Sequence, residues 1–102
     1  MYSTDAQLVV LTVLADGPRH GYAINAAIET LTGRKLGPGS LYGALTRLEA
    51  RGLVEPVAED DGQERQRIMR ITDAGRESLR AELEQLSRVA RAGLRALGAE
   101  PA

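Results

Sequence analysis

The last quarter of the chain carries an apolar pattern that a small domain cannot bury by itself. Apolar residues recur at alternating spacings of four and three along residues 72–97, with Gly93 in the one weak position. This heptad-like spacing gathers them on one narrow helix face. Such a helix is about twice the mean length of about 11–12 residues, so it should project beyond its core and bind a second subunit. The predicted interface residues of this helix are Leu79, Leu83, Leu86, Ala90 and Leu97.

A first helix is predicted over residues 5–15 and ends before Gly17 and Pro18, which stop helices. Its apolar residues occur nearly all round, so more than one neighbour must cover it. We expect part of it to face its own core, and Leu8 and Leu11 to face the second subunit. The same run of valine and leucine also fits a fully buried strand, which is the alternative.

Two shorter amphipathic helices follow, over residues 20–31 and 38–51. Gly33 ends the second helix, while Pro38 suits the first position of the third and Gly52 suits the position after its end. Apolar residues at helical spacing predict one buried stripe on each. These stripes are Ile24, Ile28 and Leu31 in the second helix, and Leu41, Leu45 and Leu48 in the third.

A two-stranded hairpin is predicted next, with strands over residues 53–57 and 66–71. Asp61-Gly62 between them is a strong turn signal, and Pro56 requires an edge position or a break. Thr72 suits the N-cap of the last helix. The predicted order is three helices, a hairpin and a last helix. This is the order of a winged helix-turn-helix, a mainly α fold of the α+β class. We assign residues 1–72 to the winged DNA-binding region and 73–102 to a dimerisation helix and tail, within one compact domain.

The charge is unevenly distributed along a chain whose net charge is only −1. Residues 17–51 hold five cations and two anions, whereas acids gather between residues 55 and 64, which include the predicted turn. A basic helix-turn-helix segment favours DNA as the partner. The small net charge and the acidic turn favour the alternative, a winged-helix module that binds another protein.

The outward face of the third helix is predicted to carry Gly39, Gly43, Thr46, Arg47 and Ala50. Two glycines keep this face thin, so that the backbone can approach a groove closely. Ser40 and the free N–H groups of the first turn can bind a phosphate. Arg47 can contact a phosphate or a guanine in the major groove. The alternative is that the glycines only punctuate a loop and Arg47 is a solvated charge.

Four stretches resemble the PadR family of bacterial transcriptional regulators. Residues 8–17 with His20-Gly21-Tyr22 resemble its first helix and the entry to its second, and Pro38-Gly39-Ser40-Leu41-Tyr42 with Arg47-Leu48-Glu49 resembles its recognition helix. Gly52-Leu53-Val54 resembles the entry to its wing, and residues 71–76 resemble the start of its last helix. The resemblance covers about residues 6 to 85.

The resemblance implies a homodimeric repressor, held by the first and last helices, whose recognition helices enter successive major grooves of a near-palindromic operator, roughly 34–36 Å apart. It also implies a small-molecule effector that binds near the subunit interface and releases the operator. Tyr22, Ser40 and Tyr42 match positions near the DNA backbone, and Arg65 and Arg67 match a basic approach to the second wing strand. The complete predicted DNA-binding set is Tyr22, Lys35, Gly39, Ser40, Tyr42, Gly43, Arg47, Arg65 and Arg67.

Other chemistry has little support in the sequence. The chain has no cysteine and one histidine, so we expect no metal site, no cofactor and no catalytic triad, and we assign His20 a structural role at a helix start. The acids of residues 59–64 lack a calcium-loop pattern and are interpreted as an acidic turn. The longest apolar run, residues 8–15, is too short to span a membrane. We therefore expect a cytoplasmic protein without a signal peptide that is not an enzyme.

Overall fold

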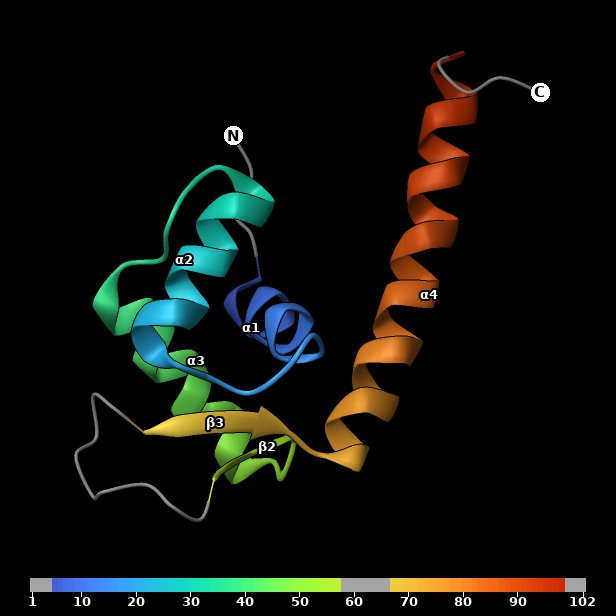
Figure 1. Ribbon diagram of the computed structural model, residues 1–102. Coiled ribbons are helices and arrows are strands. Elements are labelled where there is room, and N and C mark those ends of the chain that lie inside the picture. Colours follow the sequence, from blue (N-terminus) through green and yellow to red (C-terminus); the bar gives the residue numbers. More distant parts are fainter. Residues whose placement is uncertain (1–4, 58–66, 99–102) are drawn as a thin grey trace.

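The computed structural model describes residues 5–57 and 67–98. Three helices and a small sheet form a body, and a long fourth helix stands beside it (Figure 1). In chain order the elements are α1 (Ala6–Leu14), β1 (Arg19–His20), α2 (Gly21–Thr32), α3 (Pro38–Ala50), β2 (Val54–Pro56), β3 (Ile68–Ile71) and α4 (Asp73–Ala96).

The helix ends follow from local side-chain chemistry. The Asp5 carboxylate accepts hydrogen bonds from the backbone N–H groups of the first turn of α1, and Thr72 does the same for α4. Gly33 and Gly52 end α2 and α3 with φ of +92° and +74°, which glycine adopts readily. The four predicted helices are therefore confirmed, and the alternative of a buried strand at residues 5–15 is wrong.

The core is aliphatic and centred on α1. Helices α2, α3 and α4 and strand β3 all pack against α1, which buries five of its nine residues. The stripe of Leu41, Leu45 and Leu48 on α3 is confirmed, and so are Ile24 and Ile28 on α2. Leu31 was predicted to extend the α2 stripe, but it is 55% exposed. The prediction is wrong because the last turn of α2 borders an open groove rather than the core.

The sheet has three strands, not the two that were predicted. Its order is β1-β3-β2, all antiparallel, with Arg19 opposite Met69 and Val54 opposite Ile71. β1 contains two residues only, which is too few for an alternating pattern. Pro56 lies on the edge strand β2, as expected of a residue without an N–H donor. The predicted turn at Asp61-Gly62 and the strand start at Gln66 lie outside the described residues.

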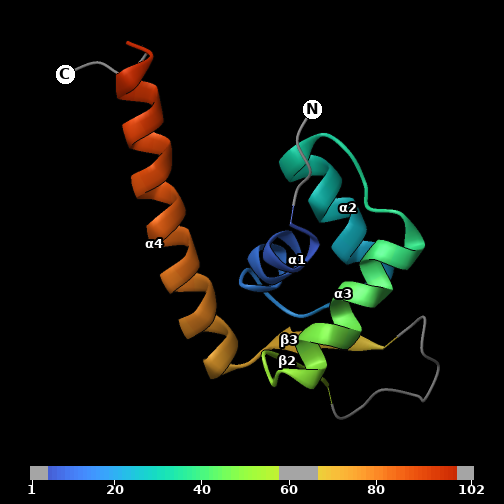
Figure 2. The same ribbon diagram turned by 180° about the vertical axis from the view of Figure 1, so that it is seen from behind.

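A tight joint connects the wing to α4. The Thr72 hydroxyl donates to the Gly52 carbonyl at 2.7 Å, and the Thr72 N–H donates to the Leu53 carbonyl at 3.0 Å. Gly75, in the first turn of α4, is buried against the same Leu53 carbonyl. The end of β3 therefore leads directly into α4, which fixes the direction in which α4 leaves the body (Figure 2).

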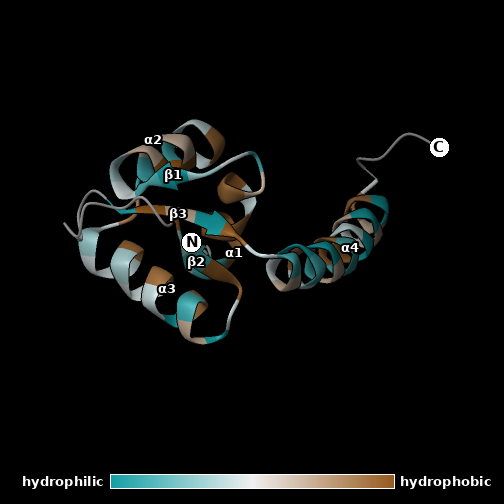
Figure 3. Ribbon diagram, turned by 60° about the horizontal axis from the view of Figure 1, so that its bottom comes forward, coloured by the Kyte–Doolittle hydropathy of each residue, from teal (hydrophilic) through white to brown (hydrophobic). Residues whose placement is uncertain are grey.

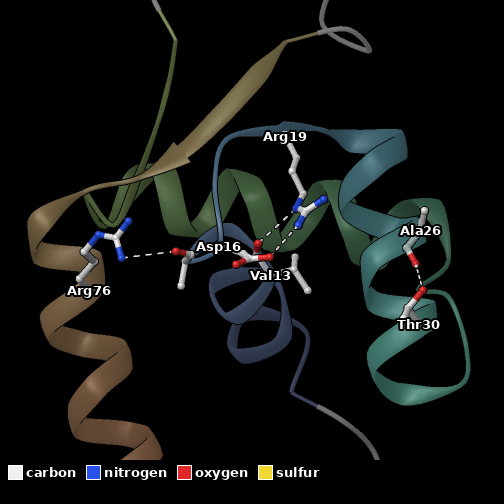
Figure 4. Close-up of polar contacts among 7 residues, drawn as sticks. Val13, Asp16, Arg19, Ala26, Thr30 and Arg76 are labelled. Carbon is white, nitrogen blue, oxygen red and sulfur yellow. Dashed lines mark hydrogen bonds and ion pairs between the residues drawn. The ribbon is translucent and has the colours of Figure 1, made fainter.

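Two guanidinium groups meet the carbonyl end of α1, where the helix dipole favours cations. Arg19 donates to the Val13 carbonyl at 3.2 Å, and Arg76 of α4 donates to the Ala15 carbonyl at 3.4 Å (Figure 4). Beyond this contact α4 leaves the body, and every residue from Arg80 to Gly98 is exposed. The molecule accordingly measures 52 × 26 × 19 Å. No helix in the described ranges is long and apolar enough to cross a membrane.

Because the start of α4 packs closely on Leu53, substitution of alanine at two glycines of α4 should change the free energy of unfolding in opposite directions. A Cβ at Gly75 would lie 2.1 Å from the Leu53 carbonyl oxygen, whereas a Cβ at Gly93 would meet nothing within 4 Å. We expect Gly75→Ala to lower the free energy of unfolding by about 1–3 kcal/mol. Gly93→Ala should raise it by about 0.5–1 kcal/mol, because alanine favours helix. Urea denaturation at one fixed protein concentration measures both free energies of unfolding. Equal effects of the two substitutions would contradict the close packing of Gly75 on Leu53.

Candidate nucleic-acid interface

One asparagine sets the turn between α2 and α3. The Asn25 side-chain amide donates to the Leu36 carbonyl and accepts from the Leu36 N–H, both at 2.8 Å. These two bonds tie the loop before α3 to the middle of α2. The Thr32 hydroxyl adds a bond to the Arg34 carbonyl at 2.9 Å. Together they hold α3 at a defined position relative to α2, as a helix-turn-helix requires.

Helix α3 turns a thin polar face to solvent. Gly39, Ser40, Thr46, Arg47 and Ala50 are exposed, and Gly43 is half-buried. Both glycines lie inside the helix, so the alternative that they punctuate a loop is wrong. A Cβ at Gly43 would lie 3.3 Å from Nη1 of Arg47, so this guanidinium lies over the glycine one turn earlier. The first turn of α3 has no side-chain cap, which leaves its N–H groups available to an anion.

Tyr42 packs on the start of α2. Gly21 is buried, and a Cβ there would lie 2.6 Å from the Tyr42 hydroxyl oxygen. The neighbouring Tyr22 is 75% exposed, and its ring stacks on His20 with 6.4 Å between ring centroids. The His20 Nδ1 accepts the Ala23 N–H at 3.4 Å and so caps α2. The predicted structural role of His20 is confirmed, and Tyr22 lies two residues beyond this cap.

The base of the wing is linked to α3 by an ion pair. Arg67, which precedes β3, lies 3.2 Å from the Glu49 carboxylate of α3. Arg70 of β3 pairs with Glu55 of β2 at 2.8 Å. Arg67 was predicted to belong to the DNA-binding set, and in the structure its guanidinium pairs with Glu49 of α3. Arg65 lies outside the described residues.

The structure brings part of the predicted DNA-binding set together. Tyr42 and Arg67 line one small pocket with Gly21, Thr46 and Glu49. Tyr22 lines the groove between α1 and α2, and exposed Lys35 lies on the loop before α3. Sequence reasoning missed Asn25, Gly21 and Glu49, which position this surface. Their partners are 11 to 21 residues away in the chain. Helical periodicity carries no signal for such contacts.

The predicted dimer residues divide into two groups. Leu11 is 2% and Leu79 is 6% exposed, so both belong to the core of their own chain and offer almost no surface to a second one. Leu8 is half-buried. Along α4 several large apolar side chains are exposed, and Val89 and Leu94, which were not predicted, are among them. Figure 3 shows hydrophobic segments of the ribbon interspersed with hydrophilic ones along α4. We call this set of exposed apolar residues the α4 stripe, and it comprises Leu83, Leu86, Val89, Ala90, Leu94 and Leu97.

No group of three or more histidine, cysteine, aspartate or glutamate side chains within the described part of the chain could hold a metal ion. The acids of the predicted turn, residues 59–64, are not among the described residues.

Comparison with known proteins agrees with this geometry. The model of the transcriptional regulator PadR-like family matches residues 10–81. The chain belongs to the PadR-like family. Transcriptional regulator Rv3488 of Mycobacterium tuberculosis is 40% identical over 88 residues, which cover 80% of this chain and 78% of that protein.

Two further similarities extend the comparison. An uncharacterized 37.1 kDa protein of transposon TN4556 from Streptomyces fradiae is 57% identical over 89 residues, which cover 87% of this chain. The match spans only 25% of that relative's length. The crystal structure of a PadR-like transcriptional regulator from Bacillus cereus superimposes with a TM-score of 0.77 at 20% identity, and the match covers 92% of each chain. The winged-helix fold of the PadR-like regulators is therefore the fold of this chain.

The packing of Tyr42 on Gly21 gives a test of the α2–α3 corner. Gly21→Ala should force the Tyr42 ring outward and lower the free energy of unfolding, because the Tyr42 hydroxyl is the nearest obstacle. In a Tyr42→Phe background the same substitution should cost about 0.5–1 kcal/mol less. Gly39→Ala is the control, since its Cβ would meet nothing within 4 Å. A double-mutant cycle, measured by denaturation, gives the coupling energy between Gly21→Ala and Tyr42→Phe. A coupling energy of zero would contradict the contact between Tyr42 and Gly21.

Proposed function

We propose that this PadR-like regulator is a repressor that binds a near-palindromic operator as a homodimer and is released by a small-molecule effector. The observation that carries the proposal is the outer face of α3. It combines an uncapped first turn, two glycines without side-chain bulk, and an arginine that lies over one of them. Such a face can enter a major groove, with its N–H groups on a phosphate and Arg47 on a base edge or a second phosphate.

Electrostatics supports DNA rather than protein as the partner. The segment from residue 17 to 51, which contains α2 and α3, holds five cations against two anions. A winged-helix module for protein binding remains the second candidate, because the whole chain has a net charge of −1. Either function is one of binding and not of enzymatic catalysis. As a regulator of operator DNA, the protein would act in the cytoplasm.

The homodimer is supported by the α4 stripe. A row of leucines on a helix that leaves its own body is costly to hold in water, and a second copy would remove it from water on both chains at once. Recognition helices on the two subunits would then face half-sites roughly 34–36 Å apart. The direction of α4 sets this separation.

The effector proposal has a candidate place at the contact between α1 and α4. A cleft of about 400 Å³ lies there, and its lining mixes apolar and charged side chains. The lining residues include Ala15, Arg76, Leu79, Arg80, Leu83 and Glu84. A ligand in this cleft would change the angle of α4 and thereby favour a dimer geometry with the wrong half-site spacing.

Replacement of Arg47 tests DNA binding directly. We expect Arg47→Ala to weaken operator binding by roughly thirtyfold or more, since a lost base or phosphate contact costs about 1–3 kcal/mol in each of two half-sites. The dimer should be unchanged. Arg91→Ala, which removes the same charge from exposed α4 outside the cleft, is the control for net charge. Fluorescence anisotropy measures the operator affinity of both variants. Equal affinities would show that Arg47 does not contact the operator.

Replacement of Leu86 tests the homodimer. Leu86 is 42% exposed in the single chain, so Leu86→Glu should leave the fold intact. In a dimer it would bury an unpaired carboxylate, which costs several kcal/mol, and the dimer Kd should rise roughly a hundredfold or more. Gln85→Glu adds the same charge one residue outside the stripe and should have little effect. Sedimentation that finds the Leu86→Glu variant fully dimeric would exclude the α4 stripe as the interface.

A further inference from the structure

The one carboxylate of α3 pairs with an arginine at the base of the wing. Glu49 is the only acid between Pro38 and Ala50, and its Oε2 lies 3.2 Å from Nη2 of Arg67, which is 18 residues later in the chain. The side chain of Arg67 is 27% exposed and that of Glu49 is 40% exposed. The pair is therefore half-buried between α3 and the wing, and solvent still reaches both groups.

Glu49 lies where a carboxylate without a counter-charge would be unfavourable in two ways. It belongs to the last turn of α3, where the helix dipole favours cations. It also follows Tyr42 and Thr46 at spacings of seven and three, so the three residues share one side of α3. All three line one cavity of about 200 Å³. A phosphate that approaches Tyr42 or Thr46 would therefore come near Glu49 and be repelled by its charge.

The two arginines nearest to Glu49 in the chain are engaged elsewhere. Nη1 of Arg47 lies 3.3 Å from the position that a Cβ on Gly43 would take, one turn earlier in α3. Arg51 donates to the glutamine side chain of α1 at 2.6 Å. Of these three arginines, Arg67 is the one whose guanidinium meets the Glu49 carboxylate. The charge of Glu49 is therefore neutralised from the wing and not from α3 itself.

A second ion pair of the wing has the same chemistry in a different place. Arg70 of β3 and Glu55 of β2 lie 2.8 Å apart, and their side chains are 55% and 46% exposed. This pair joins two strands and includes no residue of α3. It offers a matched control, because loss of Arg70 removes the same charge from the same wing and uncovers a carboxylate that α3 does not carry.

We propose that Arg67 serves DNA binding by neutralising Glu49 and not by contacting a phosphate. This inference rests on the proposed operator binding by α3 and gives Arg67 a different role within it. Glu49 supplies the carboxylate that holds the base of the wing against α3. Arg67 cancels the repulsion that this carboxylate would exert on the DNA backbone. Arg67 is thus a positioning residue that acts through Glu49.

A double-mutant cycle tests this role on a duplex from the region upstream of the protein's own gene. Arg67→Ala leaves the Glu49 carboxylate uncovered, so we expect the Kd for this DNA to rise roughly tenfold or more. Glu49→Gln in the Arg67→Ala background removes the repelling charge and should return the Kd to within roughly threefold of wild type. Glu49→Gln alone should bind at least as tightly as wild type, and Arg70→Ala should change the Kd by less than roughly threefold. Fluorescence anisotropy at several salt concentrations measures every chain. The double variant should keep the wild-type salt dependence, because no phosphate contact has been lost.

Three other outcomes would overturn the inference. If Arg67 contacts a phosphate, the double variant stays as weak as Arg67→Ala, and the salt slope of both falls by about one per half-site. If the pair only holds the wing in place, Glu49→Gln alone weakens binding as much as Arg67→Ala does. An equal loss in Arg70→Ala would show that any lost wing charge lowers the affinity. A wild-type chain that binds no DNA specifically would instead remove the proposed function itself, and this inference with it.

Discussion

The burial of α1 on several sides determines where the other elements lie. Its nine residues are almost entirely apolar, so water must be excluded from most of its surface. Helices α2 and α3 cover it from one direction, β3 from another and the first turns of α4 from a third. Arg19 and Arg76 donate hydrogen bonds to the Val13 and Ala15 carbonyls at the end of α1. The direction of α4 is therefore anchored to the same helix, α1, that supports α3.

In the proposed homodimer, this shared anchor would connect the geometry of the dimer to DNA recognition by a chain of 102 residues. Asn25 fixes α3 through the loop before it, and Thr72 with Gly75 fixes the start of α4 against the Gly52-Leu53 segment that follows α3. The contacts of Thr72 and Gly75 with Gly52 and Leu53 therefore lie within three residues of the end of α3. A change in the angle of α4 would accordingly be transmitted to the spacing of two recognition helices instead of being absorbed by a linker.

Repeated patterns were predictable from the sequence, and single contacts were not. The stripes of α3 and α4 recur over several turns, so their helices and exposed faces could be assigned. β1 has only two residues and Leu31 lies in a last turn, where periodicity no longer reports burial. Leu11 and Leu79 were assigned to a partner because an apolar pattern indicates that a face is covered but not by which chain. Asn25 and Glu49 act through residues distant in the chain, and only the folded structure reveals those contacts.

The most direct test is binding of the purified protein to the DNA upstream of its own gene, measured by mobility shift at two salt concentrations with excess competitor DNA. A regulator with the proposed α3 interface should give a retarded band that survives the competitor. The band should weaken steeply as salt rises, because each phosphate contact releases a counterion. A band lost to competitor at both salt concentrations would contradict specific DNA binding to this region and favour a protein partner.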